Sequence, residues 1–448
     1  MHITQPFVVI LLMGLKLSEV AGNCFFNNSQ SHCTCSLLHL QNIESLISCL
    51  PASVFELQGG NLERFAGFAS IRVEESAVDK LQILQVTKIV FRDLLMPEVL
   101  LAAAMKFIPY MRVTELDFES CTFLGNASWF HMNRVILPVS SLRFHNVTAI
   151  SLADRDKDFS SLSDWLENLQ NLTVTRSQVT YIPCSIGKVF RTLRYLDVSE
   201  NCLQDQSMRP SFCQGAFPQL QVLNLHHNNL SSFYTVCEML HPLKKLIHLD
   251  LSQNYLTTLP SLCEWQPSLR IFNLSTTGLN HITMSLPPRV EVLDLSSNNL
   301  HSLDLALPFL KKLHLSNNRL HAVPAAKNYP ALEVLSLDGN LIWHLPRAEL
   351  QSLRHLQSLQ AGRNLYNCSC VAANEIQALA SIESLMPDWP QDYMCESPSS
   401  YQGTLVKDVP ASVLQCNKVI VIIPVSVLLV LSCLTGIICF ARHRAWSG

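Results

Sequence analysis

The chain has 448 residues, of which 48% are hydrophobic and 15% are charged, and its formal net charge is −3. A charge this close to zero gives no overall basic character, so nucleic-acid binding is not expected. The 16 cysteines favour an oxidising compartment, because disulfides persist there and are rare in the cytosol.

Residues 1–22 are predicted to form a secretory signal peptide. The apolar run at 6–15 precedes the small residues Val20, Ala21 and Gly22, after which we expect cleavage. A membrane anchor is the alternative, but this run is shorter than the roughly 20 residues that span a bilayer.

An N-terminal cap is expected at 23–53, because capping modules close the ends of repeat arrays where the core would otherwise be exposed. Its cysteines are Cys24, Cys33, Cys35 and Cys49. We predict the disulfides Cys24–Cys35 and Cys33–Cys49.

Residues 50–110 are more apolar and less regular than the chain that follows, and 97–107 reads as a helix that begins at Pro97. One interpretation is that these side chains form the first layers of a core. The other is an apolar cavity with cations, among them Lys88 and Arg92, around its mouth. Such a mouth would suit an acylated, phosphorylated lipid, whose chains are buried and whose phosphates meet positive charge.

Leucine-rich repeats are predicted over 54–366. An apolar residue recurs at positions one, four, six and eleven, as in LRYLDVSENCL (193–203) and LKKLHLSNNRL (310–320). Each unit contributes a short strand and a return segment, and stacking buries leucines that no unit can bury alone. The expected fold is an α/β solenoid, bent like a horseshoe, with the strands lining its concave face.

A buried asparagine is expected at the ninth position of most repeats, where its amide can satisfy backbone groups as each strand turns away. These residues are Asn201, Asn228, Asn254, Asn298, Asn318, Asn340 and Asn364. Cys121 and Val147 take this place in two early repeats, so the early stack should be less regular.

The architecture favours binding over catalysis. The chain has no G-x-S-x-G, Walker, H-E-x-x-H or dinucleotide motif, so we expect neither an enzyme nor a cofactor. Four aspartates on the concave face are either ordinary solvated strand residues or an acidic binding stripe: Asp117, Asp197, Asp250 and Asp294.

Further cysteines and sequons lie within the repeats. We predict that Cys184–Cys213 and Cys237–Cys263 join neighbouring return segments, that Cys121 is a buried thiol, and that Cys202 is free or capped. The N-glycosylation sequons are Asn27, Asn126, Asn146, Asn171, Asn229, Asn273 and Asn367. A glycan on Asn273 would obstruct part of the concave face.

A cysteine-rich C-terminal cap is expected at 367–417. Because the two thiols of a C-x-C sequence diverge along a strand, we predict Cys368–Cys395 and Cys370–Cys416. A metal site is the alternative, but no histidine occurs near the C-x-C sequence.

A transmembrane helix is predicted at 418–441. Residues 419–441 carry no charge and would cover about 34 Å as a helix, enough for a hydrocarbon core of roughly 30 Å. The basic residues at 442–444 place the tail 442–448 in the cytosol. A removable lipid-anchor signal is the alternative. We therefore expect a single-pass type I protein of the plasma membrane, with extracellular repeats and a tail too short for a signalling domain.

Several segments, in order, make the N-terminal two-thirds of the chain resemble the monocyte differentiation antigen family of lipopolysaccharide co-receptors. They are CTCSLLHLQNIESLISC (33–49), VFELQGGNLERF (54–65), LQILQVTKIVFRDLLMPEVLLAAAMKFIPYMRVTELDFESC (81–121) and SLRFHNV (141–147). The C-terminal cap instead resembles that of lipopeptide-sensing Toll-like receptors.

The resemblance implies a co-receptor that binds lipopolysaccharide or other acylated microbial lipids, receives them from lipid-transfer proteins, and delivers them to a Toll-like receptor complex. It could form a homodimer. The alternatives are a Toll-like-receptor-derived decoy without a signalling domain and a leucine-rich repeat adhesion protein. The implied lipid pocket comprises Phe55, Leu57, Phe65, Phe68, Ile89, Phe91, Leu94, Leu95, Met96, Val99 and Leu100. The implied charged contacts are Glu44, Arg72, Glu74, Glu75 and Lys80, beside Lys88 and Arg92.

Overall fold

The computed structural model describes residues 24–37, 48–63, 84–124, 136–150, 166–257, 263–282, 286–410, 426–428 and 430–437. The chain forms two compact units. Unit 1 comprises residues 1–278 with 283–290, and unit 2 comprises residues 279–282 with 291–448.

Unit 1 begins with an antiparallel hairpin in which Cys24 lies opposite Cys35. Parallel strands follow, one or two from each repeat, and each pairs with the strands of the next repeat. The strands of unit 1 are β1 (Cys24–Asn27), β2 (His32–Ser36), β3 (Val54–Asn61), β4 (Lys88–Pro97), β5 (Glu115–Glu119), β6 (Thr122–Leu124), β7 (Ser141–His145), β8 (Thr148–Ile150), β9 (Asn171–Thr175), β10 (Tyr195–Asp197), β11 (Val222–Asn224), β12 (His248–Asp250) and β13 (Ile271–Asn273).

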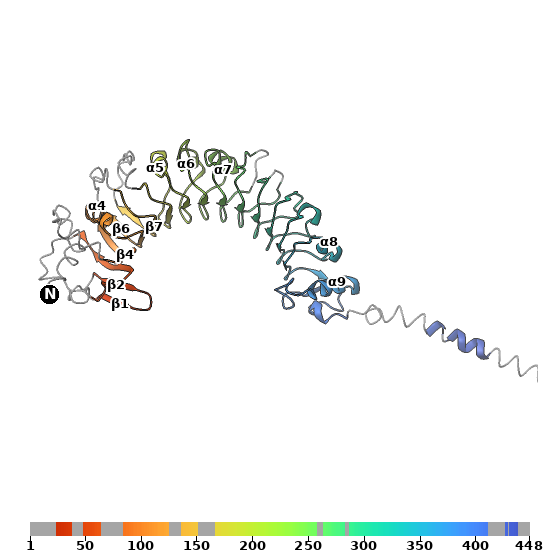
Figure 1. The fold of residues 1–448 in the computed structure, drawn as a ribbon. Helices are drawn as coiled ribbons and strands as arrows, with labels where there is room; N and C mark the ends of the chain where they lie inside the picture. Colours follow the sequence, from red (N-terminus) through yellow and green to blue (C-terminus); the bar gives the residue numbers. More distant parts are fainter. Residues whose placement is uncertain are drawn as a thin grey trace, which may run out of the picture. The chain divides into compact units, whose positions relative to one another are not determined.

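The return segments of unit 1 contain short helices, and α5, α6 and α7 lie side by side on one side of the strands (Figure 1). The predicted helix at 97–107 is confirmed, since α4 spans Glu98–Met105 and Pro97 precedes it. The others are η3 (Ile108–Tyr110), α5 (Cys184–Val189), α6 (Asp205–Ser211) and α7 (Phe233–Leu240).

The core lies between the strands and these return segments. The parallel register places equivalent leucines beside one another, so that Leu196, Leu223 and Leu249 form one buried row. Because each apolar side chain covers the next, no repeat buries its leucines without its neighbours.

The ninth-position asparagines bind neighbouring repeats together, as predicted. The Asn254 carboxamide oxygen accepts the backbone N–H of Asn228 (3.2 Å) and Leu230 (3.1 Å), and its nitrogen donates to the carbonyls of Leu225 and Leu251 (both 2.9 Å). The same pattern recurs at the other ninth-position asparagines. At Cys121 the thiol donates to the carbonyl of Phe91 (3.3 Å), and burial raises its pKa.

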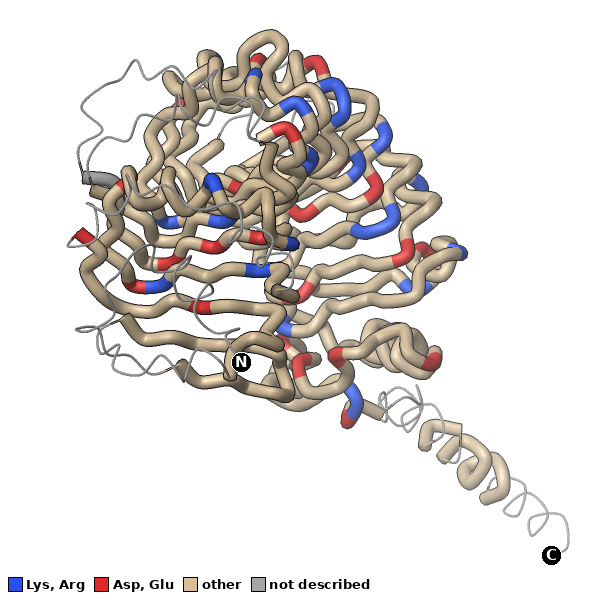
Figure 2. The backbone as a smooth tube through the Cα atoms, turned by 60° about the vertical axis from the view of Figure 1, so that its left-hand side comes forward, with Lys and Arg blue, Asp and Glu red and all other residues tan. Residues whose placement is uncertain are grey.

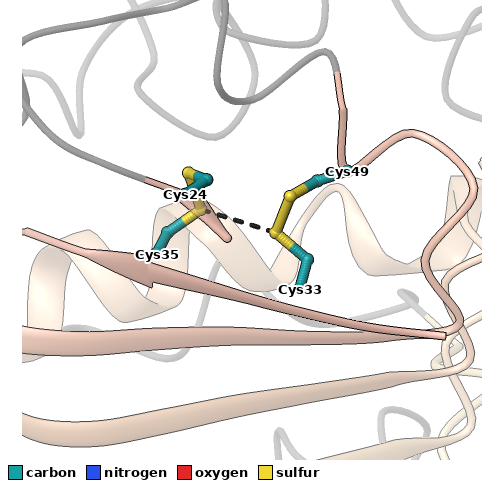
Figure 3. Close-up of side chains that lie close together, drawn as sticks. All are labelled: Cys24, Cys33, Cys35 and Cys49. Carbon is teal, nitrogen blue, oxygen red and sulfur yellow. Dashed lines mark hydrogen bonds between the residues drawn. A yellow bond between two sulfur atoms is a disulfide. The ribbon is translucent and has the colours of Figure 1, made fainter. Parts of the chain in front are cut away.

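The disulfides match the predicted pairs. Cys24–Cys35 and Cys33–Cys49 lie side by side in the N-terminal cap, with the Cys33 and Cys35 sulfurs 3.8 Å apart (Figure 3). Two further bonds join return segments, and one closes the C-terminal cap: Cys184–Cys213, Cys237–Cys263 and Cys368–Cys395. Cys370 is also disulfide-bonded, and its predicted partner, Cys416, lies outside the described residues.

Unit 2 continues the same repeat and ends in the C-terminal cap. Its repeat strands are parallel, with Leu293, Leu313, Leu335 and Leu359 in register. Its elements are β14 (Val292–Asp294), β15 (Lys312–His314), η6 (Ala326–Asn328), β16 (Val334–Ser336), α8 (Arg347–Gln351), β17 (Ser358–Gln360), β18 (Tyr366–Asn367), α9 (Cys370–Ala380), β19 (Cys395–Ser397) and η7 (Val406–Asp408).

The cap supplies the last repeat with the hydrogen-bond acceptors that a following repeat would offer. The Asp388 carboxylate accepts the backbone N–H groups of Ala361 (3.1 Å) and Gly362 (2.9 Å) and the hydroxyl of Tyr393 (3.0 Å). The Tyr393 ring stacks on Tyr366, with ring centroids 5.6 Å apart. Because both tyrosines are fully buried, the cap extends the apolar core beyond the last leucine.

Of the predicted membrane segment 418–441, the structure describes residues 426–428 and 430–437, which are helical. Within the described part of the chain, no helix has both the length and the apolar character needed to cross a membrane. The signal-peptide segment 1–22 lies outside the described residues.

We predict that Asn254→Ala lowers the free energy of unfolding by at least about 2 kcal/mol, because several buried backbone groups lose their partner at once. Urea unfolding followed by circular dichroism measures this effect. The control is Asn280→Ala, whose side chain is exposed and whose removal should change stability little. Equal effects of the two substitutions would contradict the structural role of the ladder.

We predict that Asp388→Ala speeds hydrogen exchange at the amide of Gly362 and lowers stability by about 1–3 kcal/mol, because this N–H group loses its acceptor, whereas the Ala361 N–H keeps the Tyr393 hydroxyl at 3.0 Å. Native-state hydrogen exchange with mass spectrometry checks this. Asp392→Ala is the matched control, since Asp392 is an exposed aspartate of the same cap. Unchanged protection at Gly362 would show that Asp388 is not its acceptor.

Candidate functional site

A cavity of about 390 Å³ lies inside unit 1, between the inner faces of the strands from β5 to β10 and the helices α4 and α5. Small-molecule sites occupy roughly 300–1,000 Å³, so its volume is within the range of ligand pockets. Its described lining comprises Glu98, Leu101, Met105, Leu116, Phe118, Phe123, Leu142, Phe144, Leu166, Leu172, Val174, Val179, Tyr181, Ile182, Pro183, Ile186, Val189, Phe190, Leu196, Val198 and Phe217.

Aromatic side chains form one wall of the cavity. Phe118 of β5 stacks on Phe144 of β7, with ring centroids 5.1 Å apart, and meets the edge of Phe123 at 5.6 Å. These repeats are the ones in which Cys121 and Val147 replace the ninth-position asparagine. The predicted irregularity of the early stack therefore coincides with the part of the core that contains the cavity.

The chemistry of the cavity is that of an apolar container. Among the described lining residues, only Glu98 carries a charge, and the hydroxyl of Tyr181 adds a further polar group. Tyr181 is 48% exposed, which marks it as a side chain at the opening. Burying apolar surface releases roughly 25 cal/mol per Å², so hydrocarbon chains would gain most from entering such a space.

The residues predicted as the lipid pocket precede most of the lining in the chain and are not among the described lining residues, although Val99 and Leu100 belong to α4, which contributes Glu98 and Leu101 to the wall. Most of them pack in the core: Phe55, Leu57, Ile89, Phe91, Leu94 and Met96. Leu95 and Leu100 are half-buried, Val99 is exposed, and Phe65 and Phe68 lie outside the described residues. Phe91 stacks on Phe118 at 4.9 Å, so this predicted segment supports the cavity wall from behind.

The cations expected around a pocket mouth are neutralised by carboxylates on the strand face that points away from the core. Lys88 lies 2.8 Å from Asp117 and 3.4 Å from Glu115. Arg92 lies 2.7 Å from Glu56 and 3.0 Å from Glu119. Positive and negative segments accordingly alternate on neighbouring strands of this region (Figure 2). Lys88 and Arg92 are therefore ion-paired on the strand face that points away from the cavity, and they do not surround its opening.

The pairing is strong enough to affect the ionisation of Lys88. Partial burial lowers its pKa, but hydrogen bonding and attraction from Asp117 and Glu115 outweigh this and raise the pKa overall. The remaining predicted charged contacts lie outside the described residues: Glu44, Arg72, Glu74, Glu75 and Lys80.

A second cluster consists of Cys24, Cys33, Cys35 and Cys49, whose sulfurs lie within 4.8 Å of one another (Figure 3). It is the one group in the described part of the chain with a donor set that could hold a metal ion. Zinc requires thiolates, and these sulfurs are joined in two disulfides, so the cluster is a structural cap.

The sequons differ in accessibility. Asn146, Asn171 and Asn229 are exposed, whereas Asn27 and Asn367 are half-buried. The Asn273 amide nitrogen donates to the Asp250 carboxylate at 2.9 Å on the strand face. Asn126 lies outside the described residues.

Comparison with known families and sequences agrees with the repeat and cap. The Leucine rich repeat family models match residues 245–265 and 308–366, and the Leucine rich repeat C-terminal domain matches residues 392–417. Toll-like receptor 2 of Capra hircus is 31% identical over 425 residues, covering 91% of this chain and 51% of the receptor. Toll-like receptor 2 of Homo sapiens is 33% identical over 369 residues, covering 81% of this chain and 47% of the receptor.

Solved structures support the fold. The mouse RP105/MD-1 complex matches with a TM-score of 0.51 at 19% identity, covering 80% of this chain and 67% of that one. The Drosophila Toll–Spatzle complex matches with a TM-score of 0.53 at 17% identity, covering 79% of this chain and 50% of that one.

The chain spans about half the length of the curated relatives it matches. The likeness to Toll-like receptors, predicted for the C-terminal cap alone, extends over most of the sequence. The resemblance of the N-terminal part to the monocyte differentiation antigen family stays a prediction. The chain is a leucine-rich repeat protein with a leucine-rich repeat C-terminal cap, related over most of its length to part of Toll-like receptor 2.

Proposed function

We propose that this protein binds acylated microbial lipids in the cavity of unit 1 and acts in innate immune pattern recognition at the cell surface. The observation that carries the proposal is an apolar cavity of about 390 Å³ within an otherwise close-packed repeat core. Interiors of proteins rarely leave spaces of this size empty, and an apolar lining selects an apolar occupant. The relationship to Toll-like receptor 2 supports the assignment to pattern recognition.

The cavity is suited to the acyl chains of the lipid and not to its phosphates. No Lys or Arg occurs among the described lining residues, so none of them would neutralise an anionic headgroup that entered with the chains. A phosphorylated headgroup would therefore stay outside the cavity. The proposed site lies between β5 and β10, later in the chain than the pocket implied by resemblance.

The proposed role in the cell is that of a single-pass co-receptor, with the signal peptide at 1–22, the membrane helix at 418–441 and delivery of lipid to a Toll-like receptor complex. The relatives found by comparison keep a decoy role open as a second candidate, since a receptor-like chain can also sequester ligand. The two roles predict opposite effects on the cellular response to lipid, because a co-receptor increases this response and a decoy decreases it.

We predict that Val174→Trp greatly reduces lipid binding, because the larger ring would fill part of the cavity. Val174 lines the cavity and is half-buried. Binding of fluorescent lipopolysaccharide and triacylated lipopeptide to cells that express the full chain measures the effect, normalised to surface level through an epitope tag.

The control for this experiment is Val334→Trp, which adds the same volume at a half-buried position of β16 in unit 2. We expect the control to bind lipid like the parent chain. Retention of saturable binding by Val174→Trp would exclude the cavity as the site. Absence of binding by the parent chain to both lipids would exclude the lipid-receptor proposal itself.

We predict that a stop codon after Asn417 releases the protein into the culture medium, because the proposed membrane segment 418–441 is removed. Immunoblotting of medium and cells checks this. Secretion of the full chain at the same level would contradict membrane anchoring, whereas intracellular retention of both forms would contradict the proposed signal peptide.

A further inference from the structure

Two rows of side chains lie on the outward face of strands β10 to β13, on the opposite side of the strands from the proposed lipid cavity. Parallel pairing places Tyr195, Val222, His248 and Ile271 in one row across the strands. A second row, two residues further along each strand, comprises Asp197, Asn224, Asp250 and Asn273. Both rows are half-buried, whereas the inward leucines between them are fully buried. An apolar row therefore lies beside an acidic and amide row on the same face.

The first row is largely apolar at neutral pH. Val222 and Ile271 flank His248 in register, and burial lowers the pKa of His248 despite the opposing attraction of Asp250. The imidazole therefore stays uncharged and does not neutralise the aspartate beside it.

The carboxylates of the second row are held in place by neutral donors. The Asp250 carboxylate accepts the Ser252 hydroxyl (2.6 Å), the Ser252 backbone N–H (2.8 Å) and the Asn273 amide (2.9 Å). Asp197 accepts the Ser199 backbone N–H at 3.0 Å and the Tyr195 hydroxyl at 3.3 Å. In the described part of the chain neither carboxylate has an ion pair, and β10 to β13 contain no Lys or Arg. Their negative charge is fixed in position and remains uncompensated.

The strands at the start of unit 1 show the contrasting arrangement. There Asp117, at the same repeat position as Asp197 and Asp250, lies 2.8 Å from Lys88 and 3.8 Å from Arg143. Because that earlier region neutralises its own charges and β10 to β13 do not, the negative surface has a defined boundary at Arg143. Asp117 is therefore ion-paired within its own strand face, whereas Asp197 and Asp250 keep the charge that an acidic binding stripe in unit 1 would need.

We infer that the outward face of β10 to β13 docks a basic amphipathic helix of a polypeptide partner. Two steps between strands separate Asp197 from Asp250, which is about 10 Å at the usual strand spacing. Basic residues at i and i+7 of a helix lie about 10.5 Å apart, so one helix lying across the strands can meet both carboxylates. Apolar residues on the adjoining edge of that helix then contact Val222 and Ile271.

The test uses the purified full chain carrying Ser275→Ala, captured on a biosensor through a C-terminal tag. This substitution abolishes the Asn273 sequon, whose glycan would obstruct the face, and keeps the Asn273 amide that holds Asp250. The probe is a synthetic amphipathic peptide of about 20 residues, long enough to be helical. The peptide carries lysines at i and i+7 beside a row of leucines. A second peptide with glutamates in place of the lysines is the probe for charge. We expect saturable binding of the lysine peptide, weakened by added salt, and no binding of the glutamate peptide.

Three variants locate the contact. Asp197→Asn and Asp250→Asn keep an oxygen acceptor for Ser199 and Ser252 but remove the charge, and each should weaken binding roughly two- to fivefold. Ile271→Ser should weaken binding through the apolar row. The control is Asp408→Asn, because Asp408 is an exposed carboxylate of η7 in the C-terminal cap and lies outside the strand rows.

Unchanged affinity in the Asp197→Asn, Asp250→Asn double variant would overturn the inference. Equal weakening by Asp408→Asn would also overturn it, since the attraction would then be non-specific. Thermal unfolding of each variant shows whether the fold is kept. The result is independent of lipid binding, because Val174→Trp changes the cavity and leaves this face intact.

Discussion

The requirement that every repeat bury its leucines against the next one governs this structure. A single strand with one return segment exposes both of its inner apolar side chains, and only parallel stacking in register covers them. That register also fixes where the polar groups lie. The ninth-position asparagines must satisfy the backbone of two repeats at once, as Asn254 does through its bonds to Asn228, Leu230, Leu225 and Leu251.

The same constraint explains why both ends require caps. The first and last strands have neighbours on one side only, so their backbone groups and leucines would otherwise face water. At the N-terminus two disulfides hold a hairpin against β3. At the C-terminus Asp388 and Tyr393 replace the acceptors and the apolar surface of a missing repeat.

The core is less regularly packed around β5 to β10, and the cavity lies there. Around β5 to β10 the asparagine ladder begins only at Asn201, and phenylalanines occupy inward positions that leucines fill elsewhere. The return segments around these phenylalanines do not fill the interior completely, and a cavity remains. The outward faces of the strands are free of this packing requirement, so their charges can vary from repeat to repeat. That freedom permits a compensated face beside Lys88 and Arg92 and an uncompensated one beside Asp197 and Asp250.

The sequence by itself determined the repeat and the asparagine ladder, because both follow from a spacing that recurs along the chain. It also predicted the disulfide pairs of the described cysteines. It placed the lipid pocket among Phe55, Phe91 and their neighbours, where apolar residues are dense. Density along the chain does not reveal where side chains from distant segments leave a space, and the cavity bounded by Phe118, Phe144 and α5 is visible only in the tertiary structure. The sequence likewise does not show which charged side chains form ion pairs. Lys88 and Arg92 are cations in the sequence, but strand pairing brings Asp117, Glu56 and Glu119 against them, and only tertiary contact determines which charges remain uncompensated.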